Sequence, residues 1–173
     1  WDDTSLNKWT EVYTLNVLMP VFFIKQVINN MKNKKNGRII NIASISSVKT
    51  LNIGPEYSAA KSSLVNLSES LAQECKNNGI TVNCISPGLV YTQTVKSVMC
   101  NMYNININEK DSKINKIISD NFFPNLLEGL PTPSEISKMA MFLSSDDAKH
   151  ITGQNFIIDS GYSLSNYVDS SVE

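Results

Sequence analysis

Two short apolar runs with a helix between them constrain the fold of this chain most strongly. RIINIA, residues 38–43, and ITVNCIS, residues 80–86, are rich in β-branched residues, which favours buried strands. Residues 55–78 between them carry an apolar stripe at helical spacing, and Gly79 supplies a stop. Strand, helix and strand in this order predict a right-handed βαβ unit within a parallel sheet.

The flanking segments extend this pattern. Residues 5–36 are predicted to form one long helix that ends at Gly37. Pro20 interrupts this helix and should kink it near Asn16, because proline has no N–H to give to the Asn16 carbonyl. We therefore expect an α/β fold, a Rossmann-type doubly wound parallel sheet with helices on both faces.

The last third of the chain begins with a helix signal. Thr132-Pro133-Ser134-Glu135 has the spacing of a capping box, with proline at the first helical position, and predicts a helix to about Leu143. QNFIID, residues 154–159, is predicted to be a last strand.

Composition excludes several classes of function. The chain has 173 residues and a net charge of −1, with no basic stripe, so nucleic-acid binding is disfavoured. Its three cysteines have no zinc-site spacing, and we expect no metal. No apolar run approaches the roughly 20 residues of a membrane span, so we expect no membrane partner.

A possible proton-transfer pair lies in EYSAAKSSL, residues 56–64. Tyr57 and Lys61 are four residues apart, so on a helix both side chains would share one face. A nearby ammonium group favours phenolate and lowers a tyrosine pKa from about 10, which suits acid–base work near neutral pH. This spacing also arises by chance in a chain with six tyrosines, so the pair alone is weak.

Position in the predicted sheet strengthens the pair. Ser44 follows the first strand directly, Pro87-Gly88 follows the second, and Tyr57 and Lys61 open the helix between them. In open α/β sheets, chemistry gathers beyond the carboxyl ends of the strands. We therefore expect these residues to form one site.

With these motifs the chain resembles the classical short-chain dehydrogenase/reductase family. That family has a serine thirteen residues before a YxxxK motif, and here 57 − 44 = 13. Asn16, at 44 − 16 = 28 residues upstream of Ser44, fits the family's accessory asparagine. NCISPGLVYT, residues 83–92, resembles the segment beside the nicotinamide, and the ending, residues 142–163, is similar to 3-oxoacyl-carrier-protein reductases.

The resemblance implies a role for each of these residues. Tyr57 would be the general acid or base, Ser44 would orient the substrate oxygen, and Asn16 would anchor a water that relays protons. Lys61 would tune Tyr57 and bind the ribose of the cofactor. The residues that would wrap the nicotinamide are Pro87, Gly88, Val90 and Thr92.

The resemblance also implies a missing part. The glycine-rich TGxxxGxG loop and the NNAG segment of the family do not occur in these residues. We therefore expect residues 1–173 to be the carboxyl-terminal two-thirds of a single Rossmann domain, inactive on its own. Residues 93–130 would be a substrate-loop insertion, with a floppy asparagine-rich segment as the alternative. Its apolar residues are Val95, Val98, Met99, Met102, Tyr103, Ile117, Ile118, Phe122 and Phe123.

The expected function is NAD- or NADP-dependent interconversion of a ketone and a secondary alcohol, with NADP favoured and 3-oxoacyl-like reduction as the direction. Two alternatives stay open. One is an alcohol dehydrogenase acting on a sterol- or polyol-like substrate, and the other is a non-catalytic structural or interaction subunit. The complete protein is expected to be a cytoplasmic homodimer or homotetramer, because in this family the two long helices form a four-helix bundle across a two-fold axis.

Overall fold

The computed structural model describes residues 4–49, 51, 54–122 and 127–164. The chain divides into two compact units: residues 1–86 with 137–157, and residues 87–136 with 158–173. The first unit holds the sheet and the long helices, and the second holds most of the expected insertion. Each unit is described by itself below. The expectations of a single domain and of an insertion at 93–130 stay predictions.

The long amino-terminal helix is continuous but changes type at its middle. Its segments are α1 (Leu6–Tyr13), a π-helical turn η1 (Thr14–Leu18) and α2 (Met19–Lys34). Pro20 follows the π-helical turn, in which the Met19 N–H donates to the Thr14 carbonyl. A π-helical turn therefore lies where the kink was predicted, and the kink itself stays a prediction. The prediction that the helix continues to residue 36 is wrong: it ends at Lys34, because Lys35 adopts the left-handed conformation with φ 48°.

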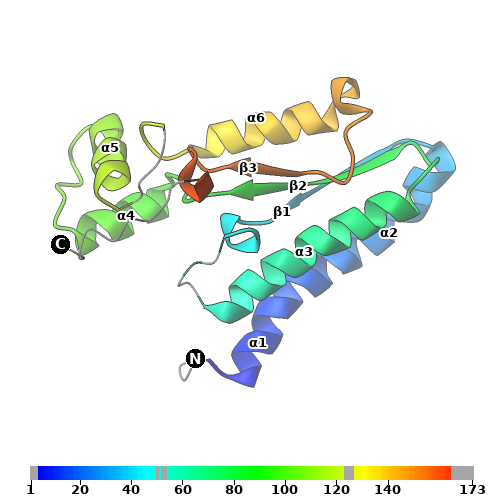
Figure 1. Cartoon of the computed structure of the whole chain (residues 1–173), viewed down its shortest axis with the longest axis horizontal. Coiled ribbons are helices and arrows are strands. Elements are labelled where there is room, and N and C mark those ends of the chain that lie inside the picture. The colour runs from blue at the N-terminus through cyan, green and yellow to red at the C-terminus, as the bar shows by residue number, and fades with distance from the viewer. Residues whose placement is uncertain (1–3, 50, 52–53, 123–126, 165–173) are drawn as a thin grey trace. The chain divides into compact units, whose positions relative to one another are not determined.

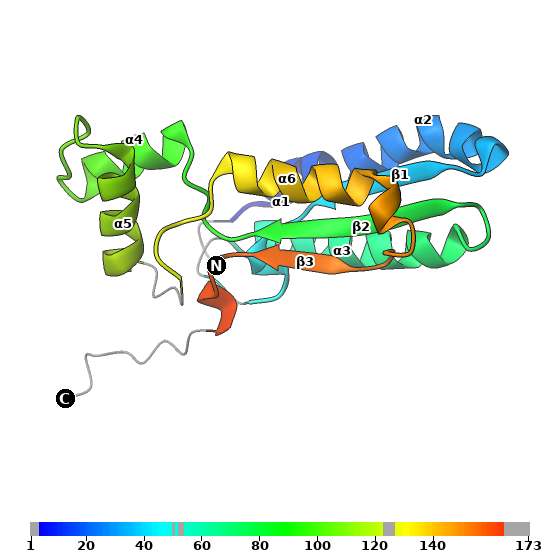
Figure 2. The ribbon, with the colours of Figure 1, turned by 90° about the horizontal axis from the view of Figure 1, so that it is seen from above.

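The three predicted strands are confirmed. Within the described residues, one sheet contains β1 (Gly37–Ile42), β2 (Ile80–Pro87) and β3 (Asn155–Ile158) in the order β1-β2-β3. β1 and β2 are parallel, with Gly37 opposite Ile80 and Ile42 opposite Ile85. β2 and β3 point the same way in Figure 2. The carboxyl ends of these strands therefore lie at one edge of the sheet, as the βαβ pattern predicted.

Helix α3 (Pro55–Glu74) connects β1 to β2. The prediction that this helix continues to residue 78 is wrong, because the chain leaves the helix at Cys75. Asn77 and Gly79 then turn the chain with φ values of 66° and 67°. A Cβ atom at Gly79 would collide with the Lys35 carbonyl oxygen, so glycine is required there to bring the chain into β2.

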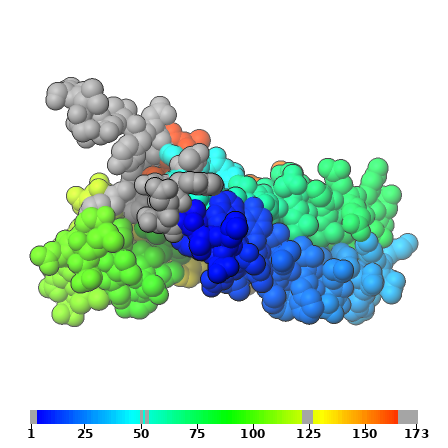
Figure 3. Space-filling model, turned by 90° about the horizontal axis from the view of Figure 1, so that it is seen from below, coloured from blue at the N-terminus to red at the C-terminus, as the bar shows by residue number. Residues whose placement is uncertain are grey.

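The helices form layers on both faces of the sheet in the first unit. α1, α2 and α3 lie on one face, and α6 (Pro133–Ser144), of which residues 137–144 belong to this unit, lies on the other (Figure 1). The surfaces of α2 and α3 lie side by side in Figure 3. Between these helices and the sheet is a core built on Ile39, Cys75, Ile80 and Val82.

The capping box predicted at the start of α6 is confirmed. The N–H and the hydroxyl of Thr132 donate to the Glu135 carboxylate at 2.6 and 2.7 Å. Glu135 therefore binds both polar groups of the residue before the helix, which fixes where α6 begins.

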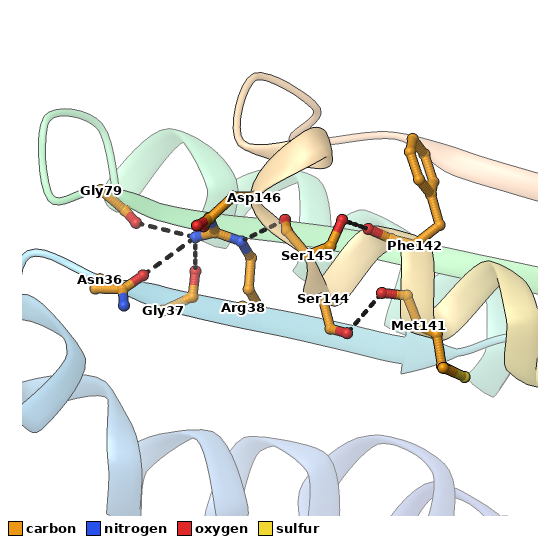
Figure 4. Close-up of polar contacts among 9 residues, drawn as sticks. All are labelled: Asn36, Gly37, Arg38, Gly79, Met141, Phe142, Ser144, Ser145 and Asp146. Carbon is orange, nitrogen blue, oxygen red and sulfur yellow. Dashed lines mark hydrogen bonds and ion pairs between the residues drawn. The ribbon is translucent and has the colours of Figure 1, made fainter.

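Arg38 ties together the amino-terminal end of the sheet (Figure 4). Its guanidinium group donates to the carbonyl oxygens of Gly37 at 3.0 Å, Gly79 at 3.5 Å and Ser145 at 3.5 Å. It also pairs with Asp146 at 3.3 Å, in the short 3₁₀ turn η3 (Asp146–Ala148) after α6. One planar cation thereby links β1, the start of β2 and the end of α6.

The second unit is more regular than we expected from its asparagine-rich sequence. It contains α4 (Gln93–Met102), α5 (Asp111–Phe122) and a 3₁₀ turn η4 (Tyr162–Leu164). Ile114 and Ile118 are fully buried in its core, together with Cys100 and Leu130. Periodic isoleucines in residues 114–118 therefore outweigh the biased composition.

A polar contact also joins α4 to the start of α5. The Asp111 carboxylate accepts from Lys96 at 2.8 Å and from the Tyr91 hydroxyl at 3.2 Å. The Lys96 ammonium lowers the pKa of Asp111. Burial, with help from Asp111, raises the pKa of Tyr91 to about 12.

The segment Leu6–Lys34 is long and apolar enough to cross a membrane, judged by length and composition alone. This is weak evidence, because core helices pass the same test. In the first unit, α1 and η1 pack on α3, and α2 packs on β1.

Candidate active site

Tyr57 and Lys61 lie on one side of α3, as their four-residue spacing predicted. The Lys61 ammonium is 5.7 Å from the centre of the Tyr57 ring. It also donates to the Ile42 carbonyl at the end of β1, at 2.8 Å. The lysine is therefore held between the sheet and the tyrosine instead of extending into solvent.

The environment of Lys61 is partly desolvated. Burial lowers the pKa of its ammonium group from the ordinary lysine value. The bond to Ile42 uses one of its three N–H donors. Within the described part of the chain, donors thus remain for hydroxyl groups of a ligand.

Ser44 is nearly buried, with 9% of its surface exposed. It follows β1 and begins the short 3₁₀ turn η2 (Ile45–Ser47), where its Oγ accepts from the Ser46 N–H at 3.2 Å. A hydroxyl that accepts a hydrogen bond still has its own proton to donate. Ser44 can therefore donate to a substrate oxygen without breaking its present contact.

Sequence reasoning missed a chain of polar contacts that supports this turn. The Ser47 hydroxyl donates to the Ser44 carbonyl at 2.6 Å. Its Oγ also lies 3.3 Å from Ser86 Oγ, and Ser86 donates to Asn155 at 2.6 Å. These residues come from three separate segments, so no local spacing could have revealed the chain. It anchors the turn carrying Ser44 to β2 and β3.

A second feature that we missed is Glu56, the residue before Tyr57. Its side chain is only 3% exposed, and it pairs with Lys8 on α1 at 2.9 Å. The Lys8 ammonium lowers the pKa of this carboxyl. The pair joins the first turn of α3 to α1, and so helps to fix the backbone beside Tyr57. The sequence shows an acidic residue next to the tyrosine, but it shows neither that this residue is buried nor that Lys8 is its partner.

Asn16 lies in the π-helical turn η1, which packs against α3. Its side-chain amide donates to the Val12 carbonyl at 2.9 Å. Because Pro20 has no N–H, the main-chain carbonyl of Asn16 lacks its α-helical donor. This carbonyl is the group that could hold a water, while the side chain is engaged within its own helix.

The expected nicotinamide segment lies in the second unit and is described separately. The Gly88 N–H donates to the Ile158 carbonyl at 2.9 Å. A Cβ atom at Gly88 would lie 2.8 Å from Asp159 Cβ, so the close passage of these segments requires glycine. Thr92 caps α4 by accepting from the Val95 N–H at 3.1 Å, which leaves its hydroxyl proton to donate. Pro87 and Val90 belong to the same segment, half-buried.

Comparison with known proteins finds relatives over most of the chain. Residues 1–163 match the family model described as Enoyl-(Acyl carrier protein) reductase. The chain is 39% identical over 154 residues to the 3-oxoacyl-acyl-carrier-protein reductase of Buchnera aphidicola, covering 88% of this chain and 56% of that enzyme. It is 29% identical to the 7alpha-hydroxysteroid dehydrogenase of Bacteroides fragilis, covering 94% and 57%.

Solved structures give the same result. The L-sorbose reductase of Gluconobacter frateurii, solved with NADPH and L-sorbose, superimposes with a TM-score of 0.82 and 26% identity. The match covers 95% of this chain and 61% of that one. The chain thus spans somewhat more than half the length of the relatives that it matches.

The fold and the matched structures define the chain as an α/β protein of the Rossmann type. More specifically, it belongs to the short-chain dehydrogenase/reductase family. The predictions of family and fold class are therefore confirmed. The roles of Asn16, Ser44, Tyr57, Lys61, Pro87, Gly88, Val90 and Thr92 stay predictions.

Proposed function

We propose that the complete protein interconverts a ketone and a secondary alcohol by hydride transfer with NAD or NADP. The observation that carries this proposal is the placement of Lys61, 5.7 Å from the Tyr57 ring and bonded to Ile42, two residues before Ser44. A phenol, an ammonium group and a hydroxyl near the end of one strand are suited to proton transfer at a carbonyl oxygen.

In the reductive direction, Tyr57 donates its proton to the carbonyl oxygen of the substrate, and the Ser44 hydroxyl donates a hydrogen bond to the same oxygen. When bound, the reduced nicotinamide supplies the hydride. The Lys61 ammonium, 5.7 Å from the centre of the Tyr57 ring, places a positive charge beside the phenol. A water on the Asn16 carbonyl would pass a proton back through Lys61. Alcohol oxidation is the reverse, with Tyr57 as the base.

The residues present fit the nicotinamide end of a dinucleotide. Lys61 has donors left for ribose hydroxyls, Gly88 permits close backbone approach, and Thr92 has a hydroxyl proton to donate. We favour NADP, and the NADPH complex of L-sorbose reductase supports this choice. These 173 residues without the phosphate loop are proposed to be inactive by themselves.

The substrate is proposed to be a 3-oxoacyl-like ketone. The 39% identity to a 3-oxoacyl-acyl-carrier-protein reductase supports this class. Oxidation of a sterol- or polyol-like alcohol is the second candidate, and the match to a 7alpha-hydroxysteroid dehydrogenase favours it specifically. A non-catalytic subunit is disfavoured, because a scaffold has no need of Asn16, Ser44, Tyr57 and Lys61 together.

Residues 93–130 are proposed to form a lid over an apolar substrate. Part of the apolar set that we assigned to this role is internal instead: Ile118 is fully buried and Met99 packs on the same core. Val98, Met102 and Tyr103 are exposed by 50%, 63% and 40%, which leaves an apolar face on α4. Of the other residues in that set, the side chain of Phe122 and all of Phe123 lie outside the described residues.

The complete protein is proposed to be a homodimer or homotetramer in the cytoplasm. Support for assembly comes from exposed apolar residues on the long helix made of α1, η1 and α2. The surfaces of α2 and α3 lie side by side, so the two helices could form one interface (Figure 3). The location and the absence of nucleic-acid and membrane partners stay predictions.

The decisive experiment is a reductase assay on the complete protein. NADPH and NADH oxidation would be followed by absorbance with a 3-oxoacyl thioester and a ketosteroid, and NADP⁺ and NAD⁺ reduction with an acyclic polyol. We expect turnover with the thioester and NADPH to exceed the other combinations. Preference for the ketosteroid or the polyol would favour the second candidate. No turnover with any of them, in a protein that binds NADPH, would contradict the proposed activity.

A further inference from the structure

The turn that begins at Ser44 is held by α3 at both of its ends. Before the turn, the Lys61 ammonium donates to the Ile42 carbonyl at 2.8 Å. After it, the hydroxyl of Ser62, the next residue on α3, donates to the Ser47 carbonyl at 3.2 Å. Consecutive residues of one helix therefore hold the main chain on either side of Ser44, and all of these residues belong to the first unit.

Strand β2 contacts the same two ends of the turn. The Ala43 N–H donates to the Ile85 carbonyl at 2.7 Å. Beyond the turn, the Ser47 Oγ lies 3.3 Å from the Oγ of Ser86, the next residue on β2. Ser47 thus contacts α3 through its carbonyl oxygen and β2 through its hydroxyl, and it is the residue at which the far end of the turn meets both elements.

Ser47 also fixes the peptide group of Ser44 from inside the turn. Its N–H and its hydroxyl both donate to the Ser44 carbonyl, at 2.9 and 2.6 Å. A carbonyl oxygen has two lone pairs, so these bonds use its full capacity. The Ser44 Oγ accepts from the Ser46 N–H at 3.2 Å, which sets the direction of the side chain. The orientation of the Ser44 hydroxyl therefore depends on a turn whose shape is set by Ser47.

The supply of hydroxyl protons ranks the contacts of Ser47. Each serine hydroxyl has one proton to donate. Ser47 gives its proton to the Ser44 carbonyl at 2.6 Å, so Ser86 would have to be the donor in the 3.3 Å contact between the two hydroxyls. Ser86, however, donates to Asn155 at 2.6 Å, and a proton directed along that short bond leaves the longer contact weak. The bond from Ser47 to the Ser44 carbonyl is therefore the strongest hydroxyl contact that holds the turn.

We propose that Ser47 is a positioning residue, which acts through Ser44 rather than on the substrate itself. Its hydroxyl holds the Ser44 main chain, and its carbonyl links the turn to the helix that carries Tyr57 and Lys61. Groups that act on one atom have to be held within about 0.5 Å of the productive geometry. The Ser44 hydroxyl and the Tyr57 phenol both have to reach one substrate oxygen, so Ser47 controls their relative position. This effect on turnover rests on the proposed reductase activity, whereas the attachment of the turn does not.

The test compares variants of the complete protein. Ser47→Ala removes the hydroxyl, and Ser47→Thr keeps one at the same position. Ser70→Ala, at an exposed serine further along α3, is the matched control. Ser44→Ala, alone and combined with Ser47→Ala, completes a double-mutant cycle, which measures whether the two residues act together. Thermal melts would verify that each variant folds.

Hydrogen exchange of main-chain amides measures the attachment of the turn without an activity assay. The N–H groups of Ser46 and Ser47 donate to the Oγ and the carbonyl oxygen of Ser44, so their exchange reports how often the turn opens. We expect these amides to exchange about fivefold faster or more in Ser47→Ala, and at nearly the wild-type rate in Ser47→Thr and Ser70→Ala. Unchanged exchange in Ser47→Ala would overturn the proposal.

The kinetic readout is kcat with NADPH and the preferred substrate of the wild type. We expect Ser47→Ala to lower kcat by about fivefold to twentyfold, with the affinity for NADPH within about twofold, and Ser47→Thr to recover most of the loss. In the Ser44→Ala background the same change should lower kcat by less than about twofold, because no hydroxyl remains to be misplaced. An equal loss in both backgrounds would overturn the positioning role. A wild type without turnover would refute the proposed function, while hydrogen exchange would still decide whether Ser47 holds the turn.

Discussion

The Lys61 ammonium donates a 2.8 Å hydrogen bond to the Ile42 carbonyl, which joins the helix that carries Tyr57 to the strand that leads to Ser44. A charged donor makes a stronger hydrogen bond than a neutral one. The contact therefore does two things at once. It positions the ammonium beside the tyrosine, and it holds α3 to the end of β1.

Replacement of Tyr57 by phenylalanine should remove catalysis and little else. The change deletes one hydroxyl, so we expect turnover to fall by about 10²–10⁴-fold while the affinity for NADPH stays within about threefold. Tyr13→Phe is the matched control, since it also removes a phenolic hydroxyl, one on α1 that lies 3.4 Å from the Ser63 hydroxyl on α3. Steady-state rates and fluorescence titration measure the two effects. A Tyr57→Phe enzyme as fast as the Tyr13→Phe control would refute the role of Tyr57.

Replacement of Lys61 by methionine should separate stability from function. Burial lowers the Lys61 pKa, because the protonated, charged form is less favourable in the folded state than in the unfolded state. Below the folded pKa, this cost lowers the free energy of unfolding. Stability of the wild type should therefore increase as the pH rises from the folded pKa towards about 10.5. We expect Lys61→Met to raise Tm by about 1–4 °C at pH 7, to lose this gain at high pH, and to abolish turnover.

Melting curves from pH 7 to 11 test this expectation. Lys25→Met, at an exposed position on α2, serves as the control and should change Tm little at any pH. A lower Tm for Lys61→Met at pH 7 would show that the bond to Ile42 outweighs the cost of burying the charge.

Much of this architecture could be predicted because it depends on local pattern. The strands β1, β2 and β3 are short β-branched runs, and α6 begins with a capping box whose members are three residues apart. The pair of Tyr57 and Lys61 needs only helical spacing to come together. Features that depend on residues within one or two helical turns of each other could therefore be predicted from the sequence.

The features that we missed depend on contacts between distant segments. Ser47 meets Ser86 across 39 residues, and Lys8 meets Glu56 from another helix. The end of α3 was also misplaced: Gly79 was predicted to end this helix, but the chain leaves the helix at Cys75 and Asn77 already adopts a left-handed conformation. In each case tertiary packing determines which polar residue makes the contact or the turn, and several nearby polar residues could do so judging by the sequence alone.

Arg38 should contribute to stability through carbonyl groups more than through its ion pair. Its side chain is 15% exposed and contacts three main-chain oxygens, whereas Asp146 is 98% exposed. We expect Arg38→Met to lower the free energy of unfolding by about 1–3 kcal/mol. Asp146→Asn should cost at most about 0.5 kcal/mol, because exposed ion pairs contribute little. Urea unfolding measures both, and equal losses would contradict this ranking.

The proposed lid makes a prediction about substrate size. Met102 is 63% exposed on α4, so Met102→Ser should leave the fold intact. If α4 covers an apolar substrate, KM for a long-chain 3-oxoacyl thioester should rise about threefold to tenfold, while KM for a short-chain one stays nearly constant. Met141→Ser, 70% exposed on α6, is the control. An equal change for both substrates would argue against a lid.

Assembly should depend on one apolar stripe of the long helix. Leu15, Leu18, Met19 and Phe22 recur at helical spacing and are exposed by 62%, 58%, 37% and 53%. A second copy of the chain could bury such a stripe along a two-fold axis. Phe22→Glu would place an unpaired charge in that interface, so we expect the dissociation constant to rise by about 100-fold or more. Asn33→Glu, an exposed change near the end of the same helix, should leave assembly unchanged. Light scattering of the complete protein at micromolar concentration measures both, and a wild-type monomer there would refute assembly through this stripe.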